Sequence, residues 1–108
     1  MLRIWVHRIR PEKEDRLRAW LSELNMRAGE VRESFRLAGI HAEQAAVVPS
    51  GGGLLLVYVS DAEDQRQAAQ TFEASQLAID HEHRRVLEEC IEETLDAIPV
   101  YDVSNRPS

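Results

Sequence analysis

Cysteine is almost absent from this chain: Cys90 is the only one among 108 residues, so no disulfide can form within the molecule. Its apolar neighbours at helical spacing favour a buried, inert thiol over a nucleophile. No apolar run approaches the roughly 20 residues that a membrane-spanning helix needs, and no secretory signal precedes the first strand pattern. These absences predict a cytoplasmic protein that makes no contact with a membrane.

Positive charge is also scarce, since 13 Lys and Arg stand against 19 Asp and Glu, for a net charge of −6. Nucleic-acid binding depends on clustered Lys and Arg, and no basic stripe is present, so we expect no nucleic-acid partner. An apolar content of 44% and a charged content of 30% are typical of an ordinary globular domain. The length predicts one domain over residues 1–104, followed by a flexible C-terminal tail over 105–108.

Alternating apolar and polar residues predict four strands, over 2–9, 40–48, 54–59 and 100–103. The last strand is short and follows Pro99, which cannot donate to a ladder, so it belongs at an edge. The glycine-rich segment 49–53 joins the second and third strands into an antiparallel hairpin. These glycines lack the strand–loop–helix context and the Lys-Ser/Thr ending of a phosphate-binding loop.

Apolar residues at steps of three and four predict the helices that separate these strands. The first is long enough to overhang the sheet unless it bends, and a glycine is the cheapest place for a bend. The expected helices are 11–38, bent at Gly29 and ended by Gly39; 61–75, capped by Asp61; and 80–98, capped by Asp80.

This order of elements predicts an α+β ferredoxin-like βαββαβ sandwich, with a four-stranded antiparallel sheet and its helices on one face. The other face stays uncovered, although its strands still offer it apolar side chains; we expect Trp5, His7, Glu43 and Tyr58 there. Monomers avoid large exposed apolar faces. The sequence therefore predicts a two-fold homodimer by sheet-to-sheet packing, a dimeric α/β barrel, with a ligand cavity between the sheet and the partner.

Several short blocks along the chain occur in the order of a known family. They are VHRIRPEKE (6–14), GIHAE (39–43), FEAS (72–75) and IDHEHRRVLEE (79–89). Up to about Glu93 they resemble a small bacterial family of unknown function in the dimeric α/β-barrel superfamily. The resemblance implies a ferredoxin-like protomer and a sheet-to-sheet homodimer. It implies no particular reaction, since that superfamily includes cofactor-free monooxygenases, haem-degrading enzymes, cyclases and mutarotases.

Three residues are candidates for acid–base catalysis: His7, Glu43 and His83. His7 stands beside Trp5 on the less apolar face of the first strand. A carboxylate such as Glu43, projecting into an apolar cavity, has a raised pKa that suits proton transfer. Helical phase turns His83 inward near a helix N-terminus, where the dipole favours a neutral ring. The structural alternatives are a hydrogen-bonded core histidine for His7 and an exposed or ion-paired glutamate for Glu43.

Four further residues are candidates for substrate binding: Trp5, Tyr58, His41 and Asp80. The two aromatic side chains can stack on a ring-shaped ligand, although such residues more often belong to a core. His41 accompanies Glu43 on the polar side of the second strand, and Asp80 begins the densest polar cluster of the chain.

The histidine pattern does not predict a metal centre. His81 and His83 are two residues apart, whereas the zincin motif needs histidines four apart on one helical face. Convergence of His7, Glu43 and His83 on a metal is a minor alternative that nothing in their spacing demands. We therefore expect neither a metal nor a tightly bound organic cofactor.

Two functions fit the sequence. The first is a cofactor-free enzyme of the isomerase, cyclase or monooxygenase type that acts on a small apolar or ring-shaped molecule. The second is a non-catalytic dimeric ligand-binding or interaction module, and haem degradation is a weaker third. An enzyme requires at least two of the three acid–base candidates to converge on one pocket.

Overall fold

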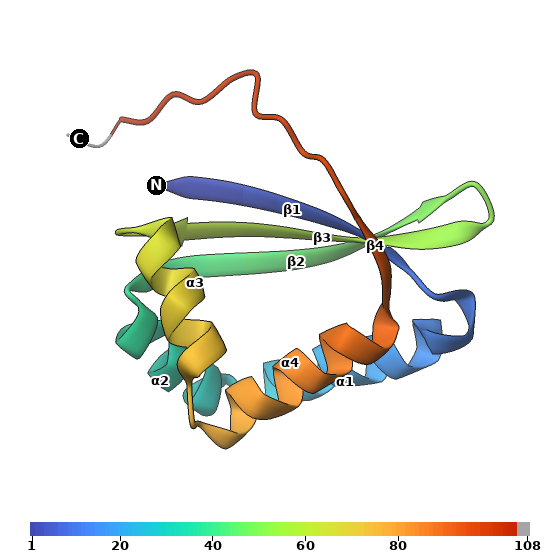
Figure 1. Ribbon diagram of the computed structural model, residues 1–108, viewed down its shortest axis with the longest axis horizontal. Helices are drawn as coiled ribbons and strands as arrows, with labels where there is room; N and C mark the ends of the chain where they lie inside the picture. Colours follow the sequence, from blue (N-terminus) through green and yellow to red (C-terminus); the bar gives the residue numbers. More distant parts are fainter. Residues whose placement is uncertain (106–108) are drawn as a thin grey trace.

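The computed structural model describes residues 1–105, which form an α+β fold around a four-stranded antiparallel sheet (Figure 1). The elements are β1 (Leu2–Ile9), the 3-10 turn η1 (Pro11–Lys13), α1 (Glu14–Met26), α2 (Ala28–Ala38), β2 (Ile40–Ser50), β3 (Gly53–Ala62), α3 (Gln65–Ala74), α4 (Ala78–Cys90) and β4 (Ile91–Leu95). The strand order β2-β3-β1-β4 is compatible with the predicted ferredoxin-like arrangement. Of the predicted tail, residues 106–108 lie outside the described residues.

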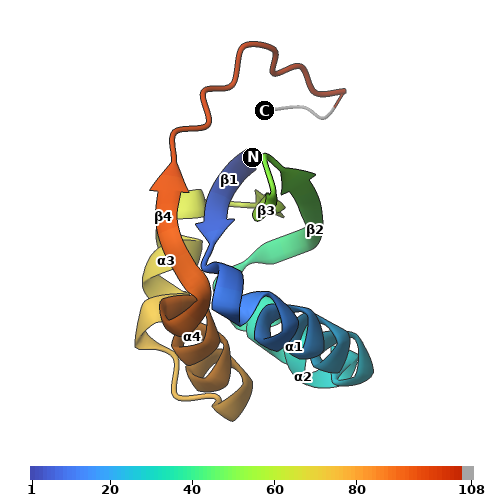
Figure 2. The same ribbon diagram turned by 90° about the vertical axis from the view of Figure 1, so that its right-hand side faces the viewer.

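The α-helices of the described chain lie on one side of the sheet (Figure 2). Register shows which side chains face them, because directly opposed residues on neighbouring strands share a face. Trp5 pairs with Tyr58, and Tyr58 is buried against the helices. His7 pairs with the fully buried Leu56, and Glu43 with the buried Ser60.

The prediction that Trp5, His7, Glu43 and Tyr58 occupy the uncovered face is therefore wrong. Both faces of β1 and β3 carry apolar residues, so alternation identifies two faces without deciding which one the helices cover. The helices pack on the face with the larger side chains, whose volume fills the space between the two layers.

The middle of the uncovered face is aliphatic, and Gln44 lies beside it on the edge strand β2. Ile4 pairs with Val59, and Val6 with Val57, in the middle of the sheet. Ile4 is 41% exposed, Val59 37% and Val48 42%, which is high for branched aliphatic residues on a sheet. Within residues 1–105, this face has no helical cover (Figure 2).

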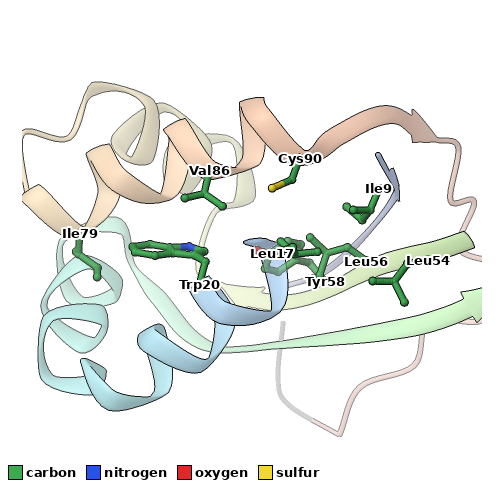
Figure 3. Close-up of a cluster of buried hydrophobic side chains, with 9 residues drawn as sticks. All are labelled: Ile9, Leu17, Trp20, Leu54, Leu56, Tyr58, Ile79, Val86 and Cys90. Atoms are coloured by element: carbon green, nitrogen blue, oxygen red, sulfur yellow. The ribbon is translucent and has the colours of Figure 1, made fainter. Parts of the chain in front are cut away.

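The main hydrophobic core lies between the helices and the sheet (Figure 3). It consists of Ile9, Leu17, Trp20, Leu54, Leu56, Tyr58, Ile79, Val86 and Cys90. The cluster joins α1 and α4 to the two central strands, β1 and β3. Cys90 is buried as predicted, and desolvation raises the pKa of its thiol, which favours the unreactive protonated form.

The long first helix breaks at Arg27, two residues before the predicted bend at Gly29. The Arg27 amide still bonds to the carbonyls of Glu23 and Leu24, while the guanidinium bonds to Glu23, Glu30 and Glu82. Because Glu82 belongs to α4, this contact fixes the break to the neighbouring helix. Gly39 ends α2 as predicted, with a left-handed φ of 70° that suits glycine.

The prediction for the C-terminal part is wrong in two ways. Helix α4 ends at Cys90 instead of Ile98, and the last strand is Ile91–Leu95 instead of 100–103. β4 pairs with β1, placing Thr94 opposite His7. From 96 to 105 the described chain has no regular structure, and Val100 and Tyr101 are almost fully exposed. The apolar positions in 91–95 fit the period of a helix as well as that of a strand. The segment becomes a strand because it can pair with the free edge of β1.

Two predicted helix caps also shift. Asp64, rather than Asp61, caps α3, because its side chain accepts a hydrogen bond from the Gln67 amide at 3.0 Å. Helix α4 starts after Leu77, so Asp80 lies inside its first turn, where a carboxylate still suits the helix dipole. None of the helices in the described part of the chain has the length and apolarity that a bilayer crossing requires.

Candidate functional site

A cavity of about 300 Å³ lies between the sheet and the helices of the same chain. This volume is at the lower end of the range for small-molecule sites. Much of its wall is aromatic or aliphatic, including Trp5, Phe35, Phe72, Ile79 and Leu87. The cavity belongs to the single chain, which corrects the prediction that it lies between the sheet and a partner.

Six of the predicted site residues line this cavity: Trp5, His7, Glu43, Tyr58, Asp80 and His83. Three strands and one helix supply them, so residues far apart in sequence meet because the helices pack back onto the sheet. His41 is absent from the wall.

His83 accepts a hydrogen bond from the indole of Trp20, with 2.7 Å between Trp20 Nε1 and His83 Nδ1. An indole nitrogen can only donate, so Nδ1 is the unprotonated nitrogen of the ring. The proton of the neutral imidazole is then on Nε2, which lies 3.2 Å from the Tyr58 hydroxyl. His83 therefore donates to Tyr58, and the phenol keeps its own proton for another acceptor.

Aromatic rings surround His83. The ring centroids of Trp20, Tyr58 and Phe72 lie 5.9, 6.1 and 5.7 Å from the imidazole centroid. Burial lowers the pKa of His83 to about 4, and the charge of Asp80 opposes this only in part. The ring is accordingly neutral at physiological pH, and the cause is burial rather than the helix N-terminus on which the prediction rests.

Glu43 projects from β2 into the cavity. Within residues 1–105, no hydrogen bond or ion pair engages its carboxyl group, and burial among protein atoms raises its pKa to about 7. The side chain keeps access to solvent, so it belongs to a half-open cavity and not to a sealed core. Burial, followed by the charge of Glu43, raises the pKa of Tyr58, which keeps the phenol protonated.

His7 lies on the wall beside Tyr58, with 6.2 Å between the ring centroids. Its Nδ1 is 2.9 Å from the Thr94 hydroxyl, and burial lowers its pKa. Thr94 was missed because its segment was assigned to a helix. A correct strand assignment would have placed it opposite His7 in the sheet.

Asp80 and His41 have structural partners. Asp80 is 5% exposed and accepts a hydrogen bond from the Ser34 hydroxyl at 2.6 Å, which ties α4 to α2. His41 is exposed, and its Nε2 lies 3.1 Å from a carboxyl oxygen of Glu63. Both side chains thus have local contacts that account for their positions.

Trp20 belongs to the core, as the sequence predicts, but its hydrogen bond to His83 of the cavity wall is not predicted. The available signal was an indole N–H on the inner stripe of a helix, which needs an acceptor when buried. In the described chain, no group of three or more His, Cys, Asp and Glu side chains is arranged to hold a metal ion. His7, Glu43 and His83, the minor alternative for a metal site, therefore do not form such a group.

The model of the family of unknown function DUF6176 matches residues 1–105. Neither a curated protein nor a solved structure matches the chain. Because the match covers nearly the whole sequence, the chain belongs to DUF6176, a family of unknown function.

Proposed function

We propose that this protein is a cofactor-independent enzyme that performs acid–base chemistry on a small, mainly apolar molecule. The supporting observation is the convergence of Glu43, Tyr58 and His7 on one cavity of about 300 Å³. A carboxyl group without a protein partner and a phenol with an uncommitted proton are the two groups that proton transfer next to a carbonyl requires.

The proposed reaction is proton transfer at a carbon beside a carbonyl group. The Glu43 carboxylate takes the proton, and the C–H electron pair becomes the new carbon–carbon double bond. The carbonyl oxygen gains negative charge, which the Tyr58 hydroxyl stabilises by donating a hydrogen bond. Glu43 then returns the proton to the same carbon. Where a second carbon–carbon double bond is conjugated with the first, Glu43 returns the proton to the far end of that system, and the double bond shifts to give an isomer. A base with a pKa of about 7 suits both steps at neutral pH.

A non-catalytic ligand-binding module is the second candidate. It is favoured by His83, whose two ring nitrogens both bond to protein side chains, Trp20 and Tyr58. In that role the same cavity holds a ligand without transferring a proton.

We also propose that the protomer forms a dimeric α/β barrel through its uncovered sheet face. Three of its strands, β1, β2 and β3, are eight to eleven residues long. The fourth strand, β4, has only five residues and extends the sheet at one end. The aliphatic centre of this face is exposed in the single chain, and monomers avoid large exposed apolar faces, which supports a second copy as its cover.

The reaction is tested by hydrogen–deuterium exchange in a panel of small cyclic ketones incubated with the protein in heavy water. We expect the wild type to accelerate exchange beside the carbonyl, followed by NMR. Glu43→Gln keeps the shape but removes the base, and should lower the rate by about 100-fold or more. Glu63→Gln, outside the cavity, is the matched control. Ketone binding without accelerated exchange would favour the binding module.

A further inference from the structure

We infer that the cavity accepts a neutral ligand with a hydrogen-bond-accepting oxygen, and that Trp20 aims the Tyr58 donor at this oxygen through His83. This inference names the ligand class of the proposed site and rests on the proposed function. Trp20 acts as a positioning residue, since it contacts His83 and does not line the cavity.

The Trp20 indole, which can only donate, sets the direction of the two hydrogen bonds of His83. If His83 carried its proton on Nδ1, two N–H groups would face each other across 2.7 Å. The indole therefore selects the Nε2–H form, and this hydrogen points at the Tyr58 oxygen. Within the described residues the Tyr58 hydroxyl has no second hydrogen-bond partner, so its own hydrogen serves an acceptor in the cavity.

The charges of the cavity lining disfavour an anionic ligand. Its described lining includes the acidic residues Glu43, Glu73 and Asp80 but no Lys or Arg. Arg32 lines an adjoining hollow instead. A carboxylate or phosphate would lose its hydration without gaining a cation, and this loss opposes its binding.

A cationic ligand fits the direction of the donor poorly. The carboxyl of Glu43 and the aromatic wall would attract an ammonium group. Tyr58, however, accepts from His83 and presents its hydrogen to the cavity, and this hydrogen repels a positive charge. A carbonyl oxygen meets the same hydrogen favourably. The apolar wall and the cavity volume then suit a carbonyl compound of one or two rings.

Three probes with the same two rings test the ligand class on the purified full chain: 2-acetylnaphthalene, 2-naphthoate and 2-naphthylmethylamine. They are neutral, anionic and cationic, respectively. We expect calorimetry to show at least tenfold tighter binding of the ketone than of either ion. Stronger binding of the acid or the amine overturns the assignment, as does failure of all three to bind at millimolar concentration.

Infrared spectroscopy of the bound ketone tests the donor and its positioning. The carbonyl stretch should move to lower frequency on binding to the wild type. Tyr58→Phe should abolish this shift, and Trp20→Phe should reduce it while ketone binding persists. Tyr101→Phe changes an exposed tyrosine outside the cavity and is the matched control, which should keep the shift. A full shift in folded Trp20→Phe overturns the role of Trp20.

Trp20 is a core residue, so its variant can fail to fold; the His83 tautomer is then read in the wild type. Nitrogen-15 NMR should show a protonated Nε2 and an unprotonated Nδ1, and the opposite tautomer overturns the inference. A carbonyl shift without deuterium exchange contradicts the proposed reaction and keeps the ligand class. Deuterium exchange without a carbonyl shift contradicts the ligand class and keeps the proposed reaction.

Discussion

His83 is bonded through both ring nitrogens and enclosed by three aromatic rings, and this environment sets its charge. Glu43 lies in the same cavity without a partner, and its pKa moves in the opposite direction, to about 7. In each case the main cause is desolvation of the charged form, which lowers the pKa of a base and raises that of an acid.

The titrations of His83 and Glu43 predict opposite pH dependences for the stability of the fold. Its pKa is about 4 when folded and 6.5 when exposed, so between these values the unfolded chain binds the extra proton. The free energy of unfolding therefore falls as pH drops from 6.5 towards 4. Glu43, with a raised folded pKa, contributes the opposite slope between pH 4.5 and 7.

Replacing His83 separates the two contributions. In the wild type the two slopes oppose each other, so removal of the ring leaves that of Glu43. We expect His83→Gln to be more stable at pH 4.5 than at pH 7, measured by urea unfolding at both values. The exposed His41→Gln is the matched control and should behave like the wild type. An unchanged pH dependence in His83→Gln would show that the ring does not resist protonation in the folded state.

The clearest difference at the level of elements concerns β4. Its apolar residues continue the stripe of α4, so local periodicity extends the helix beyond Cys90. The partner that turns this segment into a strand is β1, more than 80 residues earlier in the chain. Ile91 packs against the main core, whereas Val100 and Tyr101 do not.

Truncation distinguishes the two assignments of the last strand. A chain that ends at Ala97 should keep its free energy of unfolding within about 0.5 kcal/mol, because the residues removed from the described chain are exposed. Ile91→Ala should cost about 2 kcal/mol through lost packing. Both values come from urea unfolding. A truncation as costly as Ile91→Ala would support a strand over 100–103.

The described chain has two layers, the sheet and the helices on one side of it (Figure 2). The cavity lies between these layers, and exposed aliphatic residues lie on the other face of the sheet. The separation matters for function: one face of the sheet supplies the candidate site, and the other supplies a surface for a second copy. The proposed reaction and the proposed dimer therefore use different residues and can be tested independently.

The dimer is tested by placing a charge in the middle of the uncovered face. Val57 pairs with Val6 and Ala46 at the centre of the sheet. Sedimentation equilibrium at micromolar concentration should give a dimer for the wild type and a monomer for Val57→Glu, since a buried unpaired carboxylate opposes association. Ala19→Glu, exposed on α1, is the matched control. A wild-type monomer would contradict the proposal.

Several features of the site could be read from local pattern. The inward direction of His83 follows from helical phase, and the choice of His7, Glu43 and Tyr58 follows from strand alternation. Their meeting point could not be read, because it depends on which sheet face the helices cover. Trp20 was placed in the core correctly, but its hydrogen bond joins residues 63 positions apart.

The sequence by itself determined the α+β class, the strands β1 to β3, the end of α2 at Gly39 and the inward phase of α4, because these depend on periods within a short segment. The tertiary structure decided the helix-covered face, the location of the cavity, the break at Arg27 and the strand Ile91–Leu95. Each of these depends on contacts between distant segments. Side-chain volume between the layers decides the covered face and with it the cavity. An ion pair from Arg27 to α4 fixes the break, and pairing with the free edge of β1 makes Ile91–Leu95 a strand. Local propensity is too weak to override such contacts.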